Sequence, residues 1–211
     1  MTTGIDAVIF DFGGVLGAGV SRMMSEALGR PAASGVDLIG LVIGPRDVDS
    51  DHPFHRLERG EITLDECNAG IAELARDAGL ETAPALPPPD VMLAGLTPAT
   101  EMIAAVGTIR KAGLGTAILT NNLDGLPWRE AFDADALVDV IVESWQVGMR
   151  KPVAEIFALT LERMGGIAPE RALFLDDFPW NIAGAETAGL QTLHVTDPDA
   201  DAAVLLTRLG L

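Results

Sequence analysis

The stretch Ile5-Asp6-Ala7-Val8-Ile9-Phe10-Asp11-Phe12-Gly13-Gly14-Val15-Leu16 decides how this chain folds. It is a nearly continuous apolar run, rich in β-branched residues, that closes with a carboxylate and two glycines. Such a run predicts a strand that is buried on both faces and ends in a tight turn. Because ligands bind at the carboxyl ends of strands in open α/β sheets, Asp11 is a candidate site residue. The alternative is that Asp11 only forms the turn or caps a helix.

Beyond residue 96 the chain alternates between strand and helix patterns. The strand candidates are residues 114–119, 138–142, 172–175 and 190–195. The helix candidates are a capped helix from Thr97-Pro98 to Lys111, residues 153–164, residues 180–188 and a last helix after Asp197-Pro198. This alternation predicts a parallel sheet with helices on both faces. The predicted fold class is therefore α/β, with a Rossmann-like doubly wound sheet as its core.

Residues 17–90 predict an all-helical insertion between the first strand and the rest of this core. The helix candidates in it are residues 20–28, 36–43 and 64–78. The last of them starts at Thr63-Leu64-Asp65-Glu66, which has the form of a capping box, and stops at Gly79. The predicted domains are a core made of residues 1–16 and 91–211 and the helical insertion of residues 17–90.

Composition limits the environment and partners of the protein. The net charge is −17, from 31 acidic and 14 basic residues, so we expect no nucleic-acid partner. No apolar run is long enough for a membrane span, and the N-terminus lacks the pattern of a secretory signal, so we expect a soluble protein without a membrane partner. Cys67 is the single cysteine, which suits a reducing cytoplasm. A phosphate site in so acidic a chain needs a metal or a well-placed lysine.

Polar residues are expected to follow the predicted strands along one edge of the sheet. They are Asp11, Thr120-Asn121-Asn122, Lys151 and Asp176-Asp177. Each alone has an ordinary explanation, such as a helix cap at Thr120 or Asp177 or a solvated charge at Lys151. Together they are two acids, a hydroxyl, an amide and a lysine at successive strand ends. Helix capping explains this whole set much less well than it explains each residue alone. We therefore expect these groups to converge on one pocket.

This set suits attack by a carboxylate on phosphorus. Asp11 would be the nucleophile and form an aspartyl-phosphate that water then hydrolyses. A hard divalent cation, Mg²⁺, would bind Asp11 and Asp176, with Asp177 acting through water or fixing the neighbouring loop. Thr120 and the backbone N–H of Asn121 would hold phosphoryl oxygens, and the catalytic Lys151 would neutralise both the nucleophile and the transferring group.

The four motifs resemble those of the haloacid dehalogenase-like hydrolase superfamily in order and spacing. They are Phe10-Asp11-Phe12-Gly13-Gly14-Val15-Leu16, Leu119-Thr120-Asn121, Arg150-Lys151-Pro152 and Phe174-Leu175-Asp176-Asp177. The insertion resembles the helical cap of the subfamily that includes the phosphatase domain of soluble epoxide hydrolases and some sugar-phosphate phosphatases. The resemblance implies metal ligation by Asp11, the carbonyl of Gly13 and Asp176, phosphate binding near Gly14, and a small phosphorylated metabolite as substrate.

One departure from the family pattern leaves alternatives open. Phosphatases of this superfamily usually carry an acid/base Asp at the position of Gly13, and such a group contributes about a hundred- to ten-thousand-fold in rate. A catalytically weak or inactive phosphate-binding or regulatory protein is therefore one alternative. A metal-independent haloacid dehalogenase is another, because halide leaves without a proton. Asp176 and Thr120 favour phosphorus chemistry over cleavage of a carbon–halogen bond.

The insertion carries four cationic or titratable residues that can contact the part of the substrate that is not phosphate. They are His52, His55, Arg56 and Arg59, of which His55 and Arg59 are the candidates for substrate binding. The alternative is a solvated helix face with incidental histidines. Trp180 is expected to wall the pocket. Both a monomer and a homodimer are compatible with the sequence.

Overall fold

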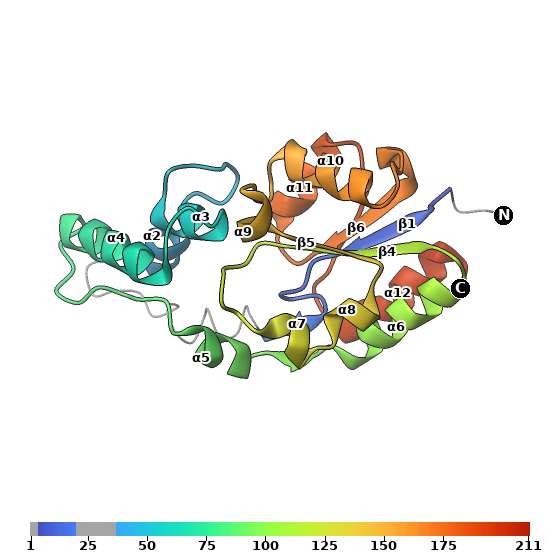
Figure 1. The fold of residues 1–211 in the computed structure, drawn as a ribbon, viewed down its shortest axis with the longest axis horizontal. Helices are drawn as coiled ribbons and strands as arrows, with labels where there is room; N and C mark the ends of the chain where they lie inside the picture. Colours follow the sequence, from blue (N-terminus) through green and yellow to red (C-terminus); the bar gives the residue numbers. More distant parts are fainter. Residues whose placement is uncertain (1–3, 20–36) are drawn as a thin grey trace.

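A parallel sheet of five strands organises the protein. The computed structural model describes residues 4–19 and 37–211. The strands are β1 (Ala7–Phe10), β4 (Gly115–Thr120), β5 (Val140–Glu143), β6 (Ala172–Asp176) and β7 (Gln191–His194), in the order β5-β4-β1-β6-β7 (Figure 1). The chain reverses its direction across the sheet beside β1, which is where ligands bind in open α/β sheets. The predicted α/β core is confirmed.

Helices cover both faces of the sheet (Figure 1). One face carries α6 (Thr100–Lys111) and α12 (Pro198–Leu209), and the other carries α10 (Ala154–Arg163) and α11 (Pro179–Thr187). Val8 and Phe10 of β1 join the hydrophobic cluster of the first face, while Ile9 joins that of the second. Burial on both sides explains why the strand is apolar at successive positions.

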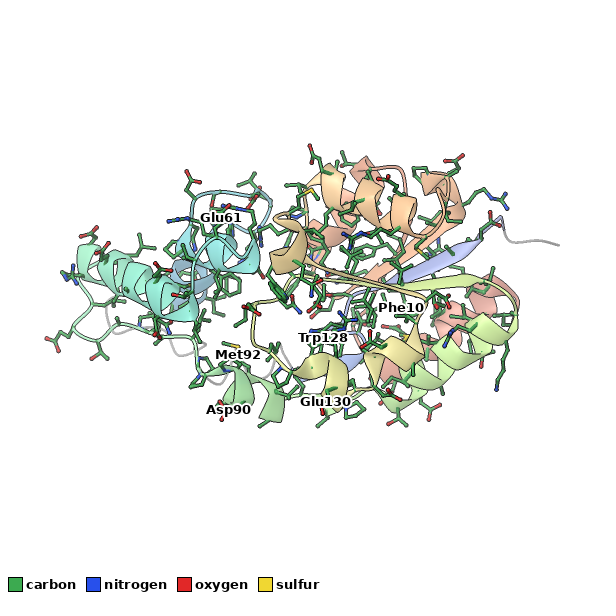
Figure 2. All side chains as sticks on the ribbon, viewed as in Figure 1. Phe10, Glu61, Asp90, Met92, Trp128 and Glu130 are labelled. Atoms are coloured by element: carbon green, nitrogen blue, oxygen red, sulfur yellow. The ribbon has the colours of Figure 1, made fainter. Side chains whose placement is uncertain are left out.

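Short elements connect these layers. They are α7 (Trp128–Ala131), α8 (Ala134–Leu137), α9 (Ser144–Val147) and a 3-10 helix at Pro169–Arg171. Trp128 is fully buried and points from α7 into the molecule, whereas Glu130 points away (Figure 2). Among the described residues, none of the helices combines the length and the apolar character that a membrane span requires.

The insertion forms a helical layer beside the sheet domain (Figure 1). It contains α2 (Leu38–Ile43), α3 (Pro53–Glu58), α4 (Leu64–Asp77) and α5 (Pro89–Ala94). These helices share a hydrophobic cluster that includes Cys67, Ile71 and Met92. The capping box at Thr63 and Glu66 starts α4 as predicted. The helix predicted over residues 20–28 lies outside the described residues, and we refer to helices α2 to α5 as the cap.

The start of α6 differs from the prediction. Thr97–Pro98 form a short strand, β3, that pairs antiparallel with β2 (Gly17–Ala18). The helix begins at Thr100, and its N-cap residue Ala99 makes no side-chain capping bond. The two chain segments that cross between core and cap therefore pair with each other, and this tertiary contact overrides the local helix-start signal. The domain boundaries at residues 16 and 91 stay a prediction.

Candidate active site

Asp11 occupies the carboxyl end of β1 and is buried. Its backbone N–H donates to the carbonyl of Leu175 at 2.8 Å, which continues the pairing of β1 with β6. The N–H of Phe12 donates to Asp11 Oδ1 at 2.7 Å, so the carboxylate is held at the edge of the sheet. The turn that follows is closed by Gly14, whose φ of 81° falls in the left-handed region that favours glycine.

Lys151 joins Asp11 to Asp176. Its Nζ lies 2.8 Å from Asp11 Oδ1 and 2.7 Å from Asp176 Oδ2, and its side chain is almost completely buried. The predicted position of Lys151 directly after a strand is wrong, because β5 ends at Glu143 and α9 and a loop intervene. The loop can still reach the site because Asn121 binds it, with Oδ1 accepting from Lys151 N at 2.8 Å and Nδ2 donating to Lys151 O at 3.0 Å.

Asp176 ends β6 and is held by two neighbours. Its Oδ1 accepts from the N–H of Phe178 at 2.8 Å, and Asn181 Nδ2 lies 3.1 Å from both carboxylate oxygens. Sequence reasoning missed Asn181. Its position in the first turn of the helix that follows the acid was the available signal.

Asp177 lies on the far side of the turn, beside Gly14. A Cβ at Gly14 would stand only 2.2 Å from Asp177 Oδ2, so the missing side chain makes room for this carboxylate. Gly14 itself does not line the cavity described below, whereas Gly13 does. The N-cap residue of α11 is Phe178 rather than Asp177, and the side chain of Phe178 makes no capping bond.

Acidic groups dominate the electrostatics of the site. Asp11, Asp176 and Asp177 each offer an oxygen within 4.8 Å of the others, and Lys151 is the ammonium between two of them. Burial raises the pKa of Asp11 well above its usual range, Lys151 opposes that rise, and repulsion from Asp176 and Asp177 adds to it. Attraction to Asp11 and Asp176 outweighs burial and raises the pKa of Lys151. Lys151 is one ammonium beside the two carboxylates of Asp11 and Asp176, and the oxygens of the three acids suit a hard divalent cation such as Mg²⁺.

A cavity of about 220 Å³ opens above Asp11, between the core and the cap. Thr120, Asn121 and Lys151 line its core side, and Trp180 walls it as the sequence suggested. The structure therefore brings Asp11, Thr120, Asn121 and Lys151 to one cavity, with Asp176 and Asp177 beside it.

His55 and Arg59 do not line this cavity. The Nδ1 of His55 accepts from the N–H of Ser50 at 3.1 Å, and its Nε2 lies 3.0 Å from the carbonyl oxygen of Ile43. Arg59 bonds to Asp49 and, at 2.6 Å, to Glu61. The geometry thus gives no support to a role in substrate binding for either residue, because their polar atoms hold the cap together.

The other two candidates of the cap also have structural partners. The Nε2 of His52 lies 3.2 Å from the carbonyl oxygen of Leu41, and its Nδ1 accepts from the N–H of Phe54. Arg56 pairs with Glu61 at 3.2 Å.

Burial lowers the pKa of His55 to about 4, with help from the nearby positive charge of Arg150, so this imidazole is neutral at pH 7.

Two buried acids that were not predicted as site residues organise the walls of the cavity. Glu58 of the cap accepts from Arg150 Nε at 2.6 Å, and both residues line the cavity. Glu143 accepts from Asn122 Nδ2 at 2.8 Å and from Trp128 Nε1 at 3.0 Å. Glu143 directly follows the strand predicted at 138–142, so its position was a signal.

The fold and the site define a class of protein: a capped α/β hydrolase with a carboxylate and a lysine at the switch point of its sheet. A family model described as haloacid dehalogenase-like hydrolase matches residues 5–189. The chain therefore belongs to the haloacid dehalogenase-like hydrolases, and the resemblance seen in its motifs is confirmed.

Curated relatives include both much longer proteins and a protein of similar length. Mouse acyl-CoA dehydrogenase family member 10 is 30% identical over 207 residues, which cover 97% of this chain and 19% of that protein. Rat bifunctional epoxide hydrolase 2 is 29% identical over 89% of this chain and 36% of its own length. The chain thus spans about a fifth to a third of these two relatives. A sesquiterpene phosphatase of Aspergillus oryzae is 28% identical over 93% of both chains.

Solved structures share the fold. A haloacid dehalogenase-like enzyme from Bacteroides thetaiotaomicron, solved as a magnesium complex, aligns over 96% of this chain and 98% of its own with a TM-score of 0.63 and 20% identity. An L-2-haloacid dehalogenase aligns over 98% and 99% with a TM-score of 0.64 and 18% identity. At this identity the likeness establishes the fold alone.

Proposed function

We propose that this protein is a Mg²⁺-dependent phosphatase that hydrolyses phosphate monoesters of small molecules through an aspartyl-phosphate on Asp11. The observation that carries the proposal is the pair of contacts from Lys151 Nζ to Asp11 and Asp176, at 2.8 and 2.7 Å. They place one ammonium between a candidate nucleophile and a candidate metal ligand. The sesquiterpene phosphatase relative, which matches over nearly the whole of both chains, also supports the proposal.

The residues divide the chemistry between two steps. In the first, an oxygen of Asp11 attacks phosphorus, the bond from phosphorus to the ester oxygen breaks, and the departing alkoxide takes a proton from water. In the second, water attacks the phosphorus of the acyl phosphate, which releases inorganic phosphate and restores the carboxylate. Lys151 and Thr120 stabilise charge on the phosphoryl oxygens in both steps.

A metal ion fits the acidic side of the site. Asp11, Asp176, Asp177 and the carbonyl of Gly13 would hold Mg²⁺, which would supply positive charge to a phosphoryl group that lies beside the carboxylates of Asp11 and Asp176. The backbone N–H of Asn121 would hold a phosphoryl oxygen. The side chains of Asn121 and Asn181 act indirectly, because the first fixes the Lys151 loop and the second fixes Asp176.

Hydrolysis of p-nitrophenyl phosphate, with Mg²⁺ and with EDTA, tests the proposal. We expect activity that requires Mg²⁺ and is lost in Asp11→Asn, while Asp124→Asn, the same change at an exposed position, retains it. Activity that survives Asp11→Asn would refute the nucleophile. Tight binding of phosphate without turnover over a broad panel of esters would point instead to a binding or regulatory protein, and halide release in EDTA would point to a dehalogenase.

A further inference from the structure

The cavity carries information about the part of the substrate that is not phosphate. Resting on the function proposed above, we infer that the substrate is the monophosphate of an apolar alcohol, whose hydrocarbon part lies between the cap and the core.

Most of the described wall away from Asp11 is hydrocarbon. From the cap and its connection to the core, the cavity is lined by Ile43, Phe54, Leu86 and Met92, and from the core it is lined by Leu123 and Leu126. Met92 projects from α5 toward the interior, whereas Asp90 of the same helix points away (Figure 2). Apolar walls with a few polar groups at one end are the usual form of a site for an amphipathic small molecule.

The charged groups of these walls have partners. Arg150 lies 2.6 Å from Glu58 and 3.8 Å from Asp49. Arg46, at the rim, lies 5.8 Å from the ring centre of Trp180 and 3.7 Å from Asp37. Apart from the Asp11 and Lys151 pair, each charged group of the described cavity wall therefore has a partner of opposite charge, and the Nη1 of Arg150 is the wall's buried cationic atom without a hydrogen bond among the described residues. A second phosphate or a carboxylate on the substrate would have to compete with these pairs.

The amide nitrogens of the wall are also committed, whereas the Oδ1 atoms of Asn122 and Asn181 are buried without a hydrogen-bond partner among the described residues. The Nδ2 groups of Asn121, Asn122 and Asn181 donate to the carbonyl of Lys151, to Glu143 and to Asp176. A sugar would bury several hydroxyl groups against apolar side chains, and each hydroxyl left without a partner is costly. A hydrocarbon has no such requirement and gains affinity with each methylene that it buries. The cavity therefore favours an alkyl or isoprenoid-like chain over a polyol.

Alkylphosphonates test this inference apart from turnover, because their carbon–phosphorus bond is not a substrate for ester hydrolysis. With Mg²⁺ present, we expect affinity by calorimetry to increase about three- to fourfold per methylene from methyl- to hexylphosphonate. A terminal hydroxyl on the hexyl chain should cancel most of that gain. Affinity that does not depend on chain length would overturn the inference.

A matched pair of variants tests where the hydrocarbon part of the substrate lies. Met92→Gln places an amide in the wall, while Val91→Gln makes a similar change at a neighbouring position that is about half exposed. We expect Met92→Gln to weaken hexylphosphonate at least tenfold and to leave methylphosphonate unchanged, and Val91→Gln to change neither. Equal effects of the two variants would contradict this placement. If p-nitrophenyl phosphate is hydrolysed but the length of the alkyl chain has no effect on binding, the inference fails and the phosphatase proposal stands. If binding depends on the length of the alkyl chain but no ester is hydrolysed, the phosphatase proposal fails and the apolar binding site stands.

Discussion

Arg150 and Glu58 form a buried ion pair that joins the core to the cap, with Arg150 Nε 2.6 Å from Glu58 Oε2. The two residues come from segments that are far apart in sequence, yet both side chains are more than nine-tenths buried. Burial raises the pKa of Glu58, and the positive charge of Arg150 opposes that rise. The pair therefore ties the cap to the residue that precedes Lys151.

We expect Glu58→Ala to destabilise the protein strongly, because it leaves the Arg150 guanidinium buried without its main partner. Loss of one member of a buried pair typically costs about 3–5 kcal/mol. The control is Glu61→Ala, which removes an acid of the same cap that is 43% exposed and pairs with Arg56 and Arg59. Its cost should stay within about 1 kcal/mol. Chemical denaturation measures the free energy of unfolding of both variants. Equal losses would show that the buried ion pair stabilises the protein no more than the exposed one.

Gly14→Ala should disturb the arrangement of Asp11, Asp176 and Asp177 in addition to straining the backbone. Its Cβ would meet the carboxylate of Asp177 at 2.2 Å and force that group to move. Gly125→Ala is a matched control, because Gly125 has the same φ of 81° and nothing within 4 Å of the added carbon. Both variants carry the strain of a left-handed alanine, about 1 kcal/mol. Only Gly14→Ala should weaken Mg²⁺ activation, by roughly ten- to a hundredfold, and a similar loss in both variants would refute the steric explanation.

Gly13→Asp should restore an acid at the position where the family usually has one. Gly13 lies outside the left-handed region, so its backbone tolerates a side chain, and it lines the cavity beside Asp11. A positioned acid contributes about a hundred- to ten-thousand-fold when the leaving group needs a proton. We therefore expect kcat/KM to rise more for alkyl phosphates than for p-nitrophenyl phosphate. A uniform change for both esters would show that protonation of the leaving group is not limiting.

His55 should make stability fall in mildly acidic solution. The pKa of His55 is about 4 in the folded state and about 6.5 when unfolded, because burial opposes the charged form. Below pH 6.5 the unfolded chain takes up a proton that the folded chain does not. The contribution of His55 to the free energy of unfolding therefore decreases as the pH falls toward 4, and it is constant above about pH 7. This shift in pKa lowers the free energy of unfolding by roughly 2 kcal/mol between pH 7 and pH 5.

Denaturation midpoints at several pH values measure this effect. His55→Gln should flatten the decrease between pH 7 and pH 5, because glutamine does not titrate. His194→Gln, at an exposed position on β7, should leave it in place. A decrease of the same size in both variants would assign it to other groups.

The sequence predicted the sheet well because strands that are buried on both faces must be apolar at successive positions, as in β1. It also indicated Asp11 and Asp176, since each directly follows or ends such a strand. The path to Lys151 could not be predicted in this way, because it depends on α9 and on the contacts with Asn121.

The cap was harder to interpret from sequence for the same reason. His55 and a substrate-binding histidine look alike in sequence, and only the contacts with Ser50 and Ile43 distinguish them. The pairing of Gly17–Ala18 with Thr97–Pro98 likewise joins segments that are remote along the chain. Local patterns carry no information about such long-range partners.

The central claim is that Asp11 takes the phosphoryl group. The most direct measurement is mass spectrometry of peptides from enzyme that was quenched in acid during turnover of p-nitrophenyl phosphate with Mg²⁺. The account predicts the added mass of one phosphoryl group on the peptide that contains Asp11, and its absence from Lys151→Met enzyme treated in the same way. A phosphoryl group on another residue, or turnover in which Asp11 is never modified, would contradict it.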